Sequence, residues 1–382
     1  AGQANDGEVE DYLADIEEEP TDERLKFQQL PLDGARVGDL QYWGHDELST
    51  AYRQEDTPQF FGCYMADDFA DREHSPVIRV KWWGSYLENE IMDPGINRFL
   101  IAFETDVPAD PAADPPYSHP GEVLQTQFVH RASALPLQPG QYSETLVSYG
   151  GPPCNENLFE YEALLENPFP QDPNTVYWIK IVAMADLLPG QWGQLQNAVA
   201  NSGLTPCEFL NLPYSQQRDF GLEQPVTRWG WHNRDYTRMD PYASTPPAVV
   251  PGEHPQGVLF PDTPAETPVW HFQDDAVSGE VFIDEAAPEM PFVDQPWWFD
   301  EYYKFAWQLC PNPQQGVDGP QEIQTYSKDL AFELWTNNDC FPSTHPDYPT
   351  WINVGKPACW CFVSQCHGDA DGIINPGDPK SG

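Results

Sequence analysis

Twenty residues near the C-terminus, CWCFVSQCHGDADGIINPGD at 359–378, combine cysteines with carboxylates, and both residue types can bind metal ions. With Asp371 at the fifth position of a twelve-residue calcium loop, Gly372 falls at the sixth, where such loops turn sharply. The remaining ligands predicted by this register are Asp369, the carbonyl of Ile373, Asn375 and Asp378. His367 falls at the first position, where calcium prefers oxygen. A calcium loop and a solvated acidic turn therefore remain as alternatives.

The three tail cysteines and His367 offer a second chemistry, a tetrahedral zinc site. Their spacing differs from the paired CxxC of structural zinc sites, and secretion would favour oxidation, so zinc is the weaker alternative. An even number of cysteines is typical of an oxidising compartment, and we predict disulfides among the following: Cys63, Cys154, Cys207, Cys310, Cys340, Cys359, Cys361 and Cys366. Three tail cysteines cannot all pair with one another. At least one is expected to bond to an earlier cysteine, unless it stays free or joins another chain.

Two Asp-Asp pairs could also bind a cation through their carboxylate oxygens. Asp67-Asp68 and Asp274-Asp275 lie at the ends of predicted strands and could converge on a structural calcium ion. Alternation along a strand puts one Asp of each pair on a given face, so one loop-capping and one solvated carboxylate is the simpler alternative. Paired carboxylates also serve glycosidases, but no nucleophile elbow, zinc-binding HExxH helix or phosphate loop is present, and we expect no catalysis.

Clustered aromatic residues could present flat faces to sugar rings or to another protein subunit. Because neighbouring residues of a strand point to opposite faces, one member of each Trp-Trp doublet is expected in the core and the other outward. The residues expected to make glycan or assembly contacts are Trp83, Tyr86, Trp229, Trp231 and Trp298.

The elements that would position these residues are mostly strands. Apolar residues alternate with polar ones in SPVIRVKWWGSYL, NRFLIAFET, TVYWIKIVA and KDLAFELWT, which is the periodicity of half-buried strands. Gln191 to Ala200 is the best candidate for a helix. With 41 prolines and 27 glycines breaking up the chain, long helices are excluded. The sequence predicts a mainly β fold, an antiparallel, jelly-roll-like β-sandwich with long Pro-rich loops and a Cys-rich C-terminal tail.

The overall charge narrows the range of partners. Sixty-one acidic and 18 basic residues give a formal net charge of -43, which repels nucleic acids and anionic bilayers and favours cations. No apolar run reaches the roughly 20 residues of a membrane-spanning helix. We therefore expect neither nucleic-acid binding nor membrane insertion.

Several phrases, in order, resemble an uncharacterised β-rich domain of secreted proteins from planctomycete-type bacteria. These are MADDF at 65–69, WWGSY at 82–86, TDVPADP…YSHPGE at 105–122, TVYWIKI at 175–181, RWGW at 228–231, FQDDAV at 272–277 and DLAFEL at 329–334. The resemblance covers roughly residues 25 to 340. It implies an extracellular β-rich module and brings no catalytic residues. DGEVEDYL at 6–13 is similar to the closing strand of another bacterial surface domain, and the tail resembles the start of dockerin-like calcium repeats.

These observations predict three segments: an acidic N-terminal strand or linker at 1–20, the β-sandwich domain at 21–340, and the Cys-rich tail at 341–382. The N-terminal strand lacks its own sheet and could add to the edge of a neighbouring subunit; its residues are Glu8, Val9, Glu10, Asp11, Tyr12 and Leu13. We predict a secreted, calcium-assisted, disulfide-stabilised cell-surface protein that assembles with copies of itself, as a filament, lattice or matrix, or with polysaccharide or other matrix material. The alternatives are a carbohydrate-binding module and, third, a glycoside-active enzyme.

Overall fold

The computed structural model describes 15 parts of the chain. They are 23–37, 40–43, 46–70, 74–89, 96–108, 112, 119–149, 156–173, 175–234, 276–287, 292–296, 305–309, 321–325, 329–337 and 346–354. The strands are β1 Glu23–Gln29, β2 Asp33–Val37, β3 Leu40–Trp43, β4 Asp46–Leu48, β5 Thr50–Arg53, β6 Gln59–Phe69, β7 Val77–Tyr86, β8 Ile96–Val107, β9 His119–Arg131, β10 Gln141–Ser148, β11 Leu158–Phe169, β12 Tyr177–Ala185, β13 Trp229–His232, β14 Val277–Asp284, β15 Phe292–Pro296, β16 Phe305–Leu309, β17 Gln321–Thr325 and β18 Phe332–Asn337. The helices are α1 Gln191–Ser202, α2 Pro206–Asn211, α3 Tyr214–Asp219, α4 Tyr348–Asn353 and the 3-10 turn η1 Leu87–Asn89.

The predicted mainly β fold is confirmed. Fourteen of the described strands form one large sheet, and β2, β3, β16 and β17 form a second, smaller one. The finer prediction of an antiparallel jelly-roll-like sandwich is not confirmed, because the large sheet is mixed: β9 pairs with β10 and β5 with β12 in parallel. Strand β1 pairs with β18, so segments near both ends of the predicted 21–340 domain lie side by side in one sheet.

The large sheet closes on itself. From β7, each strand is hydrogen-bonded to the next in the order β11, β10, β9, β8, β12 and β5. Strand β5 follows β4 in the chain after a single residue. Strand β4 pairs with β13, and β13 pairs with β7, which completes the ring. Ser49 and Thr50 make this seam. The Ser49 amide donates to the Trp229 carbonyl (3.0 Å), and the Thr50 hydroxyl both accepts from the Trp229 amide and donates to its carbonyl (2.8 Å each). The two residues thus tie segments of distant sequence into one ring of strands.

The main core lies inside this ring. Alternate residues of β7 and β8 point inward, and Trp82 packs edge-on against Phe99 with ring centroids 5.2 Å apart, although their strands are not neighbours in the sheet. A second apolar cluster, including Tyr64, Leu100 and Val182, covers the other face of β6, β8 and β12. Strand β12 is consequently buried along its whole length. The strand predicted from TVYWIKIVA is confirmed, but the expected half-burial is wrong, because apolar clusters cover both faces of β12.

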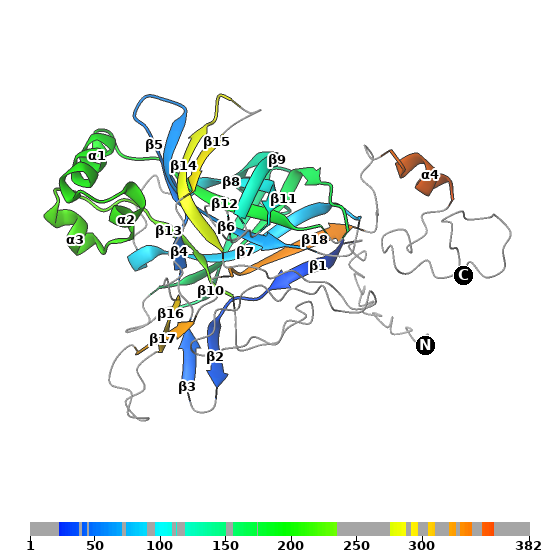
Figure 1. Cartoon of the computed structure of the whole chain (residues 1–382), viewed down its shortest axis with the longest axis horizontal. Coiled ribbons are helices and arrows are strands. Elements are labelled where there is room, and N and C mark those ends of the chain that lie inside the picture. The colour runs from blue at the N-terminus through cyan, green and yellow to red at the C-terminus, as the bar shows by residue number, and fades with distance from the viewer. Residues whose placement is uncertain are drawn as a thin grey trace, which may run out of the picture.

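Helices α1, α2 and α3 lie together at one side of the sheet, next to β5 (Figure 1). Glycines in the left-handed conformation flank α1, Gly190 at φ 79° and Gly203 at φ 71°, so the helix begins and ends sharply. The predicted helix at Gln191 to Ala200 is therefore confirmed. Helix α2 begins at a capping box, in which the Thr205 side chain accepts from the Glu208 amide and the Glu208 side chain accepts from the Thr205 amide. We call α1, α2 and α3 the helical cap.

Candidate functional site

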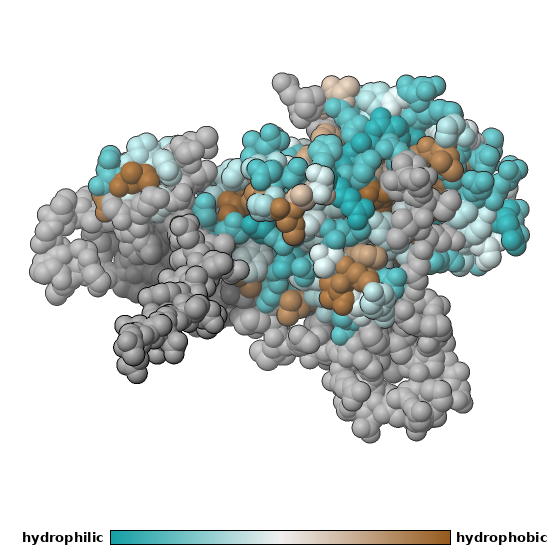
Figure 2. All heavy atoms as spheres, turned by 180° about the vertical axis from the view of Figure 1, so that it is seen from behind, coloured by the Kyte–Doolittle hydropathy of each residue, from teal (hydrophilic) through white to brown (hydrophobic). Residues whose placement is uncertain are grey.

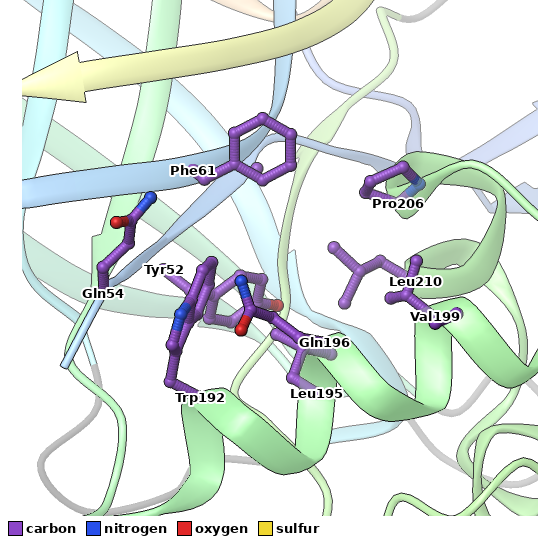
Figure 3. Close-up of a pocket in the computed structure, with 11 residues that line it drawn as sticks. Tyr52, Gln54, Phe61, Trp192, Leu195, Gln196, Val199, Pro206 and Leu210 are labelled. Atoms are coloured by element: carbon purple, nitrogen blue, oxygen red, sulfur yellow. The ribbon is translucent and has the colours of Figure 1, made fainter.

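A pocket of about 440 Å³ lies between the helical cap and strands β5 and β6 (Figure 3). Its lining is mostly apolar. Leu195 and Trp192 from α1 and Leu210 from α2 face Tyr52 of β5 and Phe61 of β6. Binding pockets for small molecules are typically concave, apolar and of this size. Among the described residues, this pocket is therefore our candidate functional site.

Tyr52 contributes a hydroxyl to the wall of the pocket. Its side chain is fully buried, and Figure 3 shows the ring projecting from the sheet toward the helices, with the hydroxyl at the far end. No described residue forms a hydrogen bond with this hydroxyl. Burial raises the pKa of Tyr52 well above its usual value, and the nearby Arg228 cation offsets only part of that rise. The phenol is thus a neutral donor with its bonding capacity unused.

The helical cap is fixed to the sheet by a disulfide between Cys63 on β6 and Cys207 on α2. Each cysteine directly follows a residue that lines the pocket, Gly62 or Pro206. Their Cα atoms are 5.7 Å apart and the bond closes a separation of 144 residues. The prediction that these two cysteines are disulfide-bonded is confirmed, and the bond holds opposite walls of the pocket together.

Hydrogen bonds orient the end of α2 that contributes Leu210. The Arg228 guanidinium donates to the carbonyls of Leu210 (3.0 Å) and Leu212 (2.7 Å), and the Gln217 amide donates to the same two carbonyls. Carbonyls at a helix C-terminus lack partners inside the helix, so these two side chains satisfy them. Arg228 and Gln217 are both buried, which makes the pocket wall preformed.

A second group of polar side chains, Asp46, Glu156 and His232, lies at β4 and β13. His232 Nδ1 is 2.9 Å from Asp46 Oδ1, and His232 Nε2 is 2.9 Å from the Leu32 carbonyl oxygen. A carboxylate and a carbonyl can only accept, so both ring nitrogens carry protons and the imidazolium is favoured. Burial lowers the pKa of His232, but Asp46 and the two hydrogen bonds outweigh it and leave the pKa raised. With no free lone pair on either nitrogen, His232 is a structural cation rather than a general base.

Two carboxyl groups, the partly buried Glu156 and the fully buried Asp67, also favour their protonated forms. Burial raises the pKa of Glu156 to about 8, and the Asp46 charge adds to the rise. Burial likewise raises the pKa of Asp67, with further contributions from Asp329 and Asp68. The folded protein therefore holds these protons over a pH range in which the unfolded chain has lost them. Each group then stabilises the fold at low pH and loses that contribution as the pH rises.

We expect the fold to lose stability steadily as the pH rises from about 5 to about 8. Glu156, Asp67 and His232 all have raised pKa values, so their contributions have the same sign in this window. Urea unfolding at several pH values measures the effect. In Glu156→Gln the slope should flatten by at most about 1.4 kcal/mol per pH unit, the value of one proton. A slope unchanged by this substitution would show that Glu156 does not contribute to the pH dependence.

The predicted calcium ligands Asp67 and Asp68 lie at the end of β6. Both side chains are fully buried, and Asp67 accepts hydrogen bonds from the amides of Leu330 (2.6 Å) and Asp68 (3.0 Å). The alternative prediction, in which one carboxylate of the pair caps a loop and the other is solvated, is therefore wrong for the second of these roles, because neither carboxylate is solvated. Within the described ranges, no group of three or more His, Cys, Asp and Glu side chains is arranged to hold a metal ion. Asp274 and Asp275 lie outside those ranges, so convergence of the two pairs stays a prediction.

The prediction that five aromatic residues point outward is wrong for the four of them that the structure describes. Trp83, Tyr86, Trp229 and Trp231 are each at most 4% exposed. Trp83 does point away from Trp82, as alternation predicted, but it packs against Leu158 and Ala331 in a small apolar cluster. Strand β7 pairs with β11, β13 and β18, so it is an interior strand of the sheet, and all its residues from Trp82 to Tyr86 are buried. None of the four offers an open face to a sugar ring.

Other predicted site residues lie outside the described residues. These are Trp298, the N-terminal strand residues from Glu8 to Leu13, the tail ligands Asp369, Asp371, Ile373, Asn375 and Asp378, and Cys154, Cys310, Cys340, Cys359, Cys361 and Cys366. The pocket residues Tyr52, Phe61 and Leu210 were missed. The helix face formed by Trp192, Leu195 and Val199 was noticed, but nothing in the sequence indicated which strands it faces.

The fold and pocket thus define a mainly β domain with a disulfide-bonded helical cap and a preformed apolar cavity. In comparisons with known proteins, residues 25–202 are similar to a domain of unknown function, DUF7901. The matched region runs from β1 to the last residue of α1, and it ends before α2 and Cys207. No curated protein and no solved structure matched the chain. Among the described residues, no helix is long and apolar enough to cross a membrane.

Proposed function

We propose that this chain is an extracellular, non-catalytic binding module that holds a small, neutral, largely apolar molecule in the pocket beneath the helical cap. The observation that carries the proposal is the Tyr52 hydroxyl, which is buried beside an apolar cavity and has no hydrogen-bond partner among the described residues. A buried, unsatisfied hydroxyl costs about 1–3 kcal/mol, and a bound ligand with one acceptor atom removes that cost. The disulfide that braces the pocket is typical of an oxidising compartment.

The lining narrows the chemistry of the ligand. Trp192 and Phe61 supply aromatic faces, against which a ring packs well. Gln54 and Gln196 are polar but uncharged. None of the described residues that line the cavity is charged, so an ion would lose its hydration without gaining a charged partner from them. A neutral molecule of one or two rings with a single carbonyl oxygen fits these features.

Figure 2 shows a mainly polar surface on one face, where the coloured apolar residues gather only in small, separate patches. Broad apolar patches usually mark protein interfaces, so this face favours a pocket over a large hydrophobic contact as the means of recognition. Self-assembly is the second candidate function. Strand β1 favours this function, because β1 lies at one end of the strand order of the large sheet and an edge strand can pair with another chain. Addition of the N-terminal strand, calcium binding and location at the cell surface stay predictions.

Acetophenone and α-methylstyrene test the proposal, because they have nearly the same shape and only the ketone accepts a hydrogen bond. We expect the wild-type protein to bind acetophenone about tenfold more tightly, the value of one hydrogen bond to an otherwise unpaired donor. In Tyr52→Phe the two affinities should become equal. Ligand-observed NMR titrations of the full chain measure both, and Trp192→Ala should weaken both ligands alike. Equal binding of the two ligands by the wild-type protein would overturn the proposal.

A matched pair of Tyr→Phe variants separates binding from folding. Tyr52→Phe removes an unpaired hydroxyl and should raise the free energy of unfolding by about 1 kcal/mol. The Tyr86 hydroxyl donates to Glu144 Oε2 at 2.6 Å, so Tyr86→Phe should instead lower it, by about 1.5–3 kcal/mol. If Tyr52→Phe destabilised the protein as much as Tyr86→Phe, the Tyr52 hydroxyl would already have a hydrogen-bond partner in the protein and could not donate to a ligand.

A further inference from the structure

A second pocket, of about 470 Å³, lies at β9, β10 and β11. Its lining is mainly polar, whereas the lining of the pocket under the helical cap is mainly apolar. The lining of the second pocket includes Thr126, Phe128 and His130 of β9, Gln141 of β10 and Glu166 of β11. It shares no lining residue with the pocket under the helical cap. The chemistry of this second pocket is therefore independent of the proposed function.

A break in strand pairing forms this polar pocket. The register of β11 against β7 shifts between Leu164 and Phe169, so the chain at Glu166 and Asn167 leaves the regular ladder. The Gln127 side chain bridges the gap: its Oε1 accepts from the Glu166 amide (2.9 Å), and its Nε2 donates to the Asn167 carbonyl (3.1 Å). The buried Gln127 thereby uses both ends of its amide to hold the wall in place.

Several polar side chains around this rigid wall have unused bonding capacity. Within the described part of the chain, the side chains of Thr126, His130 and Glu166 have no hydrogen-bond or ion-pair partner, and the Thr126 oxygen is itself buried. Gln141 uses its Oε1 to accept from the Gln138 amide (3.1 Å), and its Nε2 has no protein acceptor there. A hydroxyl, an imidazole, a carboxylate and an amide donor thus surround one cavity.

We infer that this polar pocket binds a neutral sugar ring. A sugar presents several hydroxyls that both donate and accept, which matches this mixture of donors and acceptors. Phe128 and Pro139 add apolar surface for the C–H face of the ring. The described lining residues include Glu166 and no Lys or Arg, and the whole chain carries a net charge of -43, so an anionic ligand is disfavoured.

Saturation-transfer NMR on the full chain tests this inference, with glucose, galactose, mannose and N-acetylglucosamine as neutral probes and glucuronate as the anionic one. We expect signal from at least one neutral sugar and less from glucuronate. Glu166→Gln keeps the shape but removes the charge that accepts sugar hydroxyls, so affinity for the neutral sugar should fall about tenfold or more. In the same variant, the preference for the neutral sugar over glucuronate should also become smaller. A purely structural role of Glu166 would not change this preference.

Three control variants make the result decisive. Glu223→Gln makes the same charge change at an exposed residue near α3 and should leave sugar binding unaltered. Tyr52→Phe and Trp192→Ala should also leave it unaltered, so failure of the apolar site and failure of the sugar site are told apart. No signal from any neutral sugar, or equal binding by the wild-type protein and a His130→Ala/Gln141→Ala/Glu166→Gln variant, would overturn the inference.

Discussion

Replacing Lys180 by methionine is expected to lower the free energy of unfolding by about 3–5 kcal/mol, as measured by urea denaturation. The Lys180 ammonium lies 2.7 Å from Glu104 Oε1, and the two side chains are 0% and 1% exposed. The ammonium also lies over the Tyr64 ring, 4.1 Å from its centroid. Methionine fills the same space but leaves the Glu104 carboxylate buried without its cation, and it is the uncompensated charge that destabilises.

A double-mutant cycle distinguishes loss of the charge pair from loss of packing. Glu104→Leu combined with Lys180→Met removes both charges, so the double variant should recover most of the stability that either single variant loses. Lys81→Met is the matched surface control. Its ammonium is 3.5 Å from Glu160 in a partly exposed pair, and we expect a loss of at most about 1 kcal/mol. Equal losses for Lys180→Met and Lys81→Met would contradict the interpretation of Lys180 and Glu104 as a buried pair.

The sequence predicted the individual elements well because each depends on local periodicity. Val80 and Trp82 alternate with Arg79 and Lys81, and the structure buries the first two and leaves the other two partly exposed on β7. The helix at Gln191 to Ala200 was equally visible, since its apolar residues recur at helical spacing between two glycines. Strand type and helix position therefore needed no information about distant segments.

The closure of the sheet could not be predicted, because it depends on contacts between residues far apart in sequence. Thr50 and Trp229 bond across a separation of 179 residues, and a polar Ser-Thr step beside a strand has many simpler roles in a turn or cap. The sequence alone led us to expect Trp229 and Trp231 at the surface, in contact with a glycan or another subunit. The ring places both in its interior instead, which is why the predicted platform for sugars was wrong.

The same limitation explains why neither pocket was predicted. Each pocket combines residues from segments that the fold alone brings together, and their types are ordinary: an isolated tyrosine on β5, or a glutamate at a strand irregularity. Tyr52 stands out because its hydroxyl lacks a hydrogen-bond partner among the described residues at the wall of a pocket, and Glu166 because it lies at a break in strand register. Both are properties of packing, so composition and spacing carry no signal for them.

Removing the disulfide with Cys63→Ala and Cys207→Ala together is expected to lower the free energy of unfolding by about 2–5 kcal/mol. The bond closes a loop of 144 residues, and a cross-link over so long a loop strongly restricts the unfolded chain. The Cys63 and Cys207 side chains are both buried, so alanine introduces no unpaired polar group. Urea unfolding under non-reducing conditions measures the change, and the double variant avoids the unpaired thiol that a single substitution would leave.

Loss of the disulfide should also weaken binding beneath the helical cap more than it weakens binding at the polar pocket. Pro206 and Leu210 belong to α2, which the bond fixes to β6, whereas Gln127 braces the polar pocket by bonds within the sheet. Titrating the double variant with acetophenone and with a neutral sugar compares the two sites in one protein. Equal weakening at both would mean that the bond stabilises the domain as a whole. Selective loss of acetophenone binding would show that it preorganises the apolar pocket.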